Sequence, residues 1–148
     1  MTTFVPVDPA HAEGSAAALL ARVKSKLGVV PSVTRHMARS PAVLAGYLGF
    51  AGALGDGILP AKLREQIALA TAEANACEYC LSAHSLIGKG AGLSAEEIAA
   101  ARGADAAEER ARAALRFARA VIDARGHASD ADVRAVRAVK PRAEAVAA

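Results

Sequence analysis

The sequence gathers its most reactive side chains in one short stretch, "EANACEYCLSAHS", residues 73–85. This stretch holds the two cysteines of the chain, Cys77 and Cys80, and then His84. Two cysteines separated by two residues can close a disulfide, and the unpaired backbone N–H groups in the first turn of a helix stabilise a thiolate. We predict a helix break at "ANA", residues 74–76, which puts Cys80 in the first turn of the following helix. Cys80 is therefore the candidate for the attacking sulfur.

His84 follows Cys80 by four residues, so both side chains are expected on one face of that helix. A free imidazole titrates near neutral pH and can hold the proton of a thiol. Once a peroxide has oxidised Cys80 to a sulfenic acid, Cys77 can condense with it to a disulfide as the resolving cysteine. Such a cycle needs no metal, haem or flavin, and we expect no cofactor.

Two carboxylates could orient His84. Glu73 lies one helical turn before Cys77 and is the nearer one by simple helix geometry. Glu65 lies twelve residues before Cys77, about 18 Å away along a continuous helix, and reaches His84 only if two helices fold back on each other. Spacing alone does not decide which of the two carboxylates orients His84.

The cysteine pair could also serve in two other ways. Cys77, Cys80 and His84 could be three ligands of zinc, or the pair could be buried and inert. The remaining histidines do not stand at a ligand-like spacing from these three: His11, His36 and His127. Covalent haem needs a histidine directly after the second cysteine, where this chain has Leu81.

The segments that must position these residues are predicted to be helices. Pro60 opens a central helix, "PAKLREQIALATAEANA", with a core stripe of Leu63, Ile67, Ala70 and Ala74. The segment "LSAHSLIGKGAG" predicts a second helix that glycines end. A capping box at residues 94–97 predicts a short third one.

The flanking segments predict further helices. In the N-terminal part, Asp8 and Pro9 are expected to open a helix that Gly28 ends, and a short helix should lie between Pro31 and Pro41. The helix after Pro41 carries a glycine at every third position from 46 to 55, which predicts close helix packing, within the chain or between subunits. In the C-terminal part, a long helix is expected over 105–125 and a last one from residue 129.

Composition supports an all-α fold. Hydrophobic residues make up 53% of the 148 residues but aromatic residues only 3%, a mixture typical of close-packed helices rather than sheets. We expect one domain over 1–148, with N-terminal helices in 9–55, a core motif in 60–98 and C-terminal helices in 105–139.

The charge pattern and the apolar segments predict neither a nucleic-acid partner nor a membrane. The net charge of +3 is mild and basic residues alternate with acidic ones. The longest uncharged run, residues 40–55, is short for a membrane span, and the first residues lack a secretory pattern. We expect a cytoplasmic protein, where a Cys-x-x-Cys pair is more often catalytic or metal-binding than structural.

The segment "LREQIALATAEANACEYCLSAHSLIGKGAGLSAEEI" resembles the core of the AhpD-like alkylhydroperoxidases, within the carboxymuconolactone decarboxylase family. The resemblance is dense over about residues 60–98 and rests on a glutamate twelve positions before Cys-x-x-Cys and a histidine four positions after it. It implies an all-helical bundle in which a central helix hairpin carries the Cys-x-x-Cys motif, and a homo-oligomer, trimeric or hexameric.

By position, the resemblance implies a peroxidatic Cys80, a resolving Cys77, and a proton relay of His84 and Glu65, and so favours Glu65 over Glu73. It implies a peroxide substrate and a dithiol reductant, a dihydrolipoyl group on a partner protein. Some members have a second relay histidine between the cysteines, where this chain has Tyr79. Two alternatives stay open: a decarboxylase-like lyase, and a redox-sensing oligomer without turnover.

Overall fold

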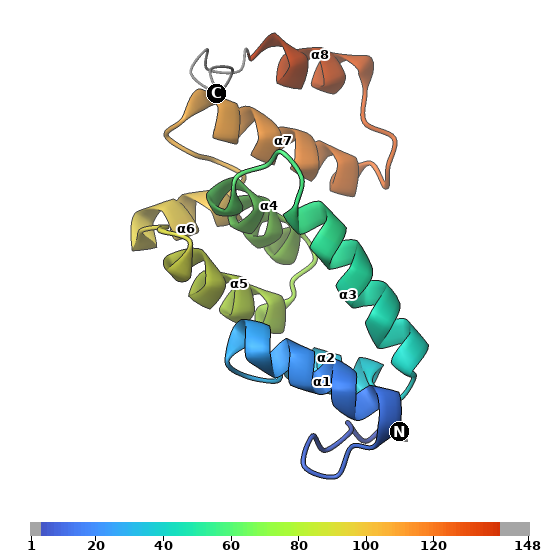
Figure 1. Ribbon diagram of the computed structural model, residues 1–148. Helices are drawn as coiled ribbons and strands as arrows, with labels where there is room; N and C mark the ends of the chain where they lie inside the picture. The colour runs from blue at the N-terminus through green and yellow to red at the C-terminus, as the bar shows by residue number, and fades with distance from the viewer. Residues whose placement is uncertain (1–3, 140–148) are drawn as a thin grey trace, which may run out of the picture. The chain divides into compact units, whose positions relative to one another are not determined.

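The computed structural model of the chain describes residues 4–139, and all regular secondary structure in this range is helical (Figure 1). The all-α prediction is confirmed. Contacts divide the chain into two compact units, unit 1 (Met1–Ile58) and unit 2 (Leu59–Ala148). None of the helices in the described range is long and apolar enough to cross a membrane.

Unit 1 contains α1 (Gly14–Leu27), α2 (Ser32–Met37) and α3 (Pro41–Gly55). Its small core is built on Leu20, Ala38 and Leu44. The predicted boundaries after α1 are confirmed: Gly28 ends α1 with a left-handed φ of 74°, and Pro31 and Pro41 flank α2.

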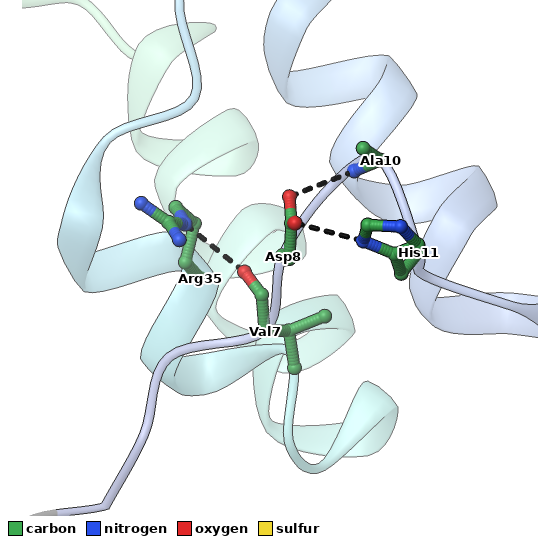
Figure 2. Close-up of polar contacts among 5 residues, drawn as sticks. All are labelled: Val7, Asp8, Ala10, His11 and Arg35. Atoms are coloured by element: carbon green, nitrogen blue, oxygen red, sulfur yellow. Dashed lines mark hydrogen bonds and ion pairs between the residues drawn. The ribbon is translucent and has the colours of Figure 1, made fainter.

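The prediction that Pro9 opens the first helix is wrong, since α1 begins at Gly14. Figure 2 shows the reason. The Asp8 carboxylate accepts hydrogen bonds from the backbone N–H of Ala10 (3.0 Å) and from the His11 ring (2.8 Å), which closes a turn instead of capping a helix. Arg35 donates from Nε to the Val7 carbonyl at 3.0 Å and so holds the segment before the turn against α2.

Helix α3 carries the glycine series and buries a single side chain, Leu44. A Cβ built at Gly46, Gly49, Gly52 or Gly55 would have no other atom within 4 Å. Among the described residues of unit 1, which are 4–58, the expected packing of a helix onto these glycines is therefore not found. Packing of this face against another subunit stays a prediction.

Unit 2 contains α4 (Ala61–Ala74), α5 (Glu78–Gly90), α6 (Ala95–Arg102), α7 (Glu109–Asp123) and α8 (Asp130–Ala138). Helix α4 packs against α5, α6 and α7, so it is the central element of the unit (Figure 1). The core includes the fully buried Leu69 of α4 and Leu115 of α7, together with Ile98 of α6. Burying such side chains stabilises a fold by about 1.5–3 kcal/mol each.

The predicted core stripe of α4 is correct only in part. Leu63 and Ala70 are buried, but Ile67 and Ala74 are only partly buried, and Gln66, Leu69 and Ala72 are buried in addition. A central helix that packs against three neighbours buries more than one stripe, which a single periodic pattern does not describe.

The predicted start of the long C-terminal helix at residue 105 is wrong, since α7 begins at Glu109. The Asp105 carboxylate accepts hydrogen bonds from the N–H of Ala106 (2.9 Å) and from Arg112 Nε (2.8 Å), and this holds residues 105–108 in a loop. The capping box predicted at Ser94 is confirmed, and so is the helix start at Ser129, where the structure shows a second capping box.

Candidate functional site

The cysteine pair lies at the turn between α4 and α5. Helix α4 ends at Ala74, and Ala76 takes a left-handed φ of 50°, which reverses the chain. Cys77 is the N-cap of α5, and its sulfur accepts a hydrogen bond from the Cys80 N–H at 3.2 Å. Cys80 therefore lies in the first turn of α5, as predicted from the sequence.

Cys77 and Cys80 form a disulfide, with their Cα atoms 5.3 Å apart. A separation of this size is within the usual range for disulfides and needs no opening of the helix. Both residues are partly buried, so the pair sits at the surface of unit 2 and not in its core.

The α4–α5 hairpin brings Glu65 and His84 together although 19 residues separate them. His84 Nδ1 lies 2.8 Å from Glu65 Oε2. The Glu65 side chain is 17% exposed and that of His84 is 35% exposed, so solvent reaches the pair mainly from the histidine side. A carboxylate that accepts the Nδ1 proton leaves Nε2 as the free ring nitrogen, which fixes the tautomer and the orientation of the ring.

Glu73, the carboxylate that local helix geometry favoured, is engaged elsewhere. Its Oε2 lies 2.6 Å from Arg102 Nε of α6, in an ion pair at the surface. Glu73 stands near the end of α4, while the antiparallel return of α5 places His84 beside the earlier residue Glu65. The structure thus brings Glu65, and not Glu73, to the histidine.

Gly88 is a positioning residue that the sequence analysis missed. It lies on α5 four residues after His84 and is buried. A Cβ built at Gly88 would lie 2.9 Å from Leu93 Cδ1 and 3.7 Å from Glu65 Cβ, so α5 faces Glu65 here with little room for a side chain larger than a methyl group. The signal in the sequence was a glycine inside a helix, one turn from a site residue.

The site offers two kinds of chemistry. A dithiol can be oxidised to the disulfide and reduced again, and a carboxylate–imidazole pair can accept and donate a proton. Cys80 and His84, four residues apart on α5, project from one face of that helix. Among the described residues there is no group of three or more His, Cys, Asp or Glu side chains placed to hold a metal ion.

Comparison with known proteins gives a family. No curated protein matches the chain. The model of the carboxymuconolactone decarboxylase family matches residues 41–120, which is 80 of the 148 residues and covers the whole α4–α5 hairpin. That family includes AhpD-like proteins, in agreement with the resemblance of the central motif. The chain therefore belongs to the carboxymuconolactone decarboxylase family.

Proposed function

We propose that the protein is a thiol-dependent peroxidase that reduces hydrogen peroxide or organic hydroperoxides through the Cys77–Cys80 couple. One observation carries this proposal: a disulfide at the first turn of α5 stands one turn before a histidine that a carboxylate holds at 2.8 Å. A redox pair and a proton relay on one hairpin are the two components that peroxide reduction by thiols requires.

In the proposed cycle, the Cys80 thiol loses its proton to His84 Nε2, and the thiolate attacks one oxygen of the peroxide bond. The O–O bond breaks, Cys80 becomes a sulfenic acid, and the departing alkoxide takes the proton from His84 to leave as an alcohol. Glu65 stabilises the imidazolium while it exists, because its carboxylate accepts the Nδ1 proton.

Cys77 then attacks the sulfur of the Cys80 sulfenic acid. The S–S bond forms, the S–O bond breaks, and hydroxide leaves as water with the proton of the Cys77 thiol. One organic hydroperoxide and two thiols thus give one alcohol, one water and one disulfide, and hydrogen peroxide gives two waters instead. The disulfide is the form present in the structure.

A dithiol reductant is needed to close the cycle by thiol–disulfide exchange. The partly buried position of both cysteines at the surface of unit 2 suits attack by an external thiolate. We propose a dihydrolipoyl group on a partner protein as this reductant, in the cytoplasm, where thiols are kept reduced. We also propose that the protein forms a homo-oligomer.

The first test is stoichiometric. Reduced protein is mixed with one equivalent of cumene hydroperoxide, and free thiols and peroxide are followed together. We expect two thiols to disappear per peroxide, and a dithiol to restore them. Cys80→Ser should consume no peroxide, while Cys77→Ser should consume one equivalent and form no disulfide within the chain. Peroxide turnover by Cys80→Ser would refute the proposal, as would thiols that stay reduced.

A lyase is the second candidate, because the family also bears the name of a decarboxylase and because the Glu65–His84 pair is an acid–base pair that does not need sulfur. It predicts decarboxylation of a small acidic lactone that survives in the double variant Cys77→Ser/Cys80→Ser. Loss of that activity together with peroxidase activity in the double variant would exclude the lyase.

A further inference from the structure

A cavity of unit 2 lies away from the cysteine pair. It opens between the first turns of α4, α6 and α7 and has a volume of about 380 Å³. Its lining is mainly apolar, with Leu63 from α4, Ala100 from α6, Ala106 from the loop before α7 and Ala111 from the first turn of α7. None of the four residues of the cysteine site lines it. Its size falls within the range of cavities that hold small organic molecules.

Gln66 is the polar group inside this cavity. The residue is only 5% exposed and lines the cavity, yet its side-chain amide makes no hydrogen bond to any residue of the described range. Fully buried side-chain nitrogen and oxygen atoms in that range all have a partner, so the Gln66 amide must reach solvent, and the cavity is where it does so. An amide that reaches solvent only through the cavity can bond to water there, and a ligand that enters the cavity must replace that water with hydrogen bonds of its own.

The charged residues around the cavity disfavour an anion. Lys62 is paired with Glu97 at 2.7 Å, so these two charges cancel. The remaining charges are the cation of Arg110 and the carboxylates of Glu96 and Glu108, a net of −1. A ligand that brings a further negative charge would be repelled, whereas a neutral one would not.

We propose that this cavity binds a small neutral molecule that has a planar apolar body and carries a hydrogen-bond donor next to an acceptor, as a primary amide or a lactam does. The Gln66 side chain presents one acceptor and one donor on the same edge, and such a ligand edge satisfies both at once. The alanine and leucine walls contact the apolar body. The proposal does not depend on peroxidase activity, because the two sites share no residue.

Three probes of nearly equal shape test this chemistry on the full chain: benzamide, acetophenone and benzoate. Benzamide carries donor and acceptor, acetophenone only the acceptor, and benzoate a negative charge. Binding is followed by the ¹⁵N–¹H signals of Ala106 and Ala111, which line the cavity. We expect saturable shifts with benzamide at low millimolar concentration and at least about fivefold weaker binding of the other two, because each leaves part of the Gln66 amide unpaired or adds repulsion.

Gln66→Leu removes the amide at similar volume, and we expect it to abolish the preference for benzamide over acetophenone. Asn75, the other side-chain amide of the chain, is exposed and bonds to the Thr71 carbonyl, so Asn75→Leu is the matched control and should keep the preference. Gln66→Met makes the same test if the leucine variant does not fold. Equal affinities of the three probes, no saturation up to about 20 mM, or a preference that survives both Gln66 variants would overturn the proposal.

Discussion

Replacing Glu65 by glutamine tests the proton relay most directly. The glutamine has nearly the shape of the glutamate and stays within reach of His84 Nδ1, so the change removes charge and little else. A hydrogen bond to a charged group contributes about 1.5–3 kcal/mol and a neutral one about 1 kcal/mol. Because solvent reaches both side chains, we take the difference as about 1–2 kcal/mol. Since about 1.4 kcal/mol is tenfold in rate, Cys80 oxidation should slow roughly five- to thirtyfold.

The assay is stopped-flow mixing of reduced protein with cumene hydroperoxide, followed by loss of free thiols. The final stoichiometry of two thiols per peroxide should be unchanged in Glu65→Gln, because the relay sets the rate and not the products. The matched control is Glu73→Gln, eight residues later on the same helix, whose carboxylate pairs with Arg102 at the surface. Exposed pairs of this kind contribute about 0–1 kcal/mol to stability, and the control should react within about twofold of the unmodified rate.

Two results would refute the reasoning. A wild-type rate for Glu65→Gln would mean that the 2.8 Å contact is not used during oxidation. A slow Glu73→Gln beside a fast Glu65→Gln would mean that the hairpin rearranges when the disulfide is reduced and that the carboxylate nearest in sequence takes over. Thermal unfolding of each variant separates either result from loss of the fold.

Three further predictions concern α5 and α6. Gly88→Leu should lower both the melting temperature and the rate of Cys80 oxidation, because the larger side chain forces α5 away from α4. Gly90→Leu, at a position with open space, should leave both nearly unchanged. Equal effects of the two substitutions would contradict the role of Gly88. Ser94→Ala should reduce the free energy of unfolding by about 1 kcal/mol in urea, because it removes the cap of α6, and an unchanged midpoint would speak against it. The ammonium of Lys62 and the Ser94 N–H hold the pKa of Glu97 below its usual range, so this carboxylate stabilises the fold above about pH 4.3 and loses that effect as the pH falls. The decline in melting temperature on acidification should therefore be smaller in Glu97→Gln than in the unmodified protein. An equal decline in both would contradict this role of Glu97.

Helix starts show where local patterns are reliable. Ser94 and Ser129 begin their helices as predicted, because a capping box satisfies the first N–H groups from within four residues. Asp8 and Asp105 have the same capping chemistry, yet each carboxylate closes a turn instead, to His11 in one case and to Arg112 in the other. A carboxylate accepts whichever donors the folded chain brings to it, and the sequence pattern alone does not rank them.

The sequence by itself determined the helical class, the break before Cys77 and the place of Cys80 in the first turn of α5, because all three depend on interactions within a few residues. The choice between Glu65 and Glu73 depended on the tertiary structure. Distance along a helix favoured Glu73, but the hairpin turn at Ala76 returns α5 along α4, so that His84 and Gly88 lie beside Glu65. Only packing between helices brings residues 19 positions apart to 2.8 Å, and no spacing rule contains that information.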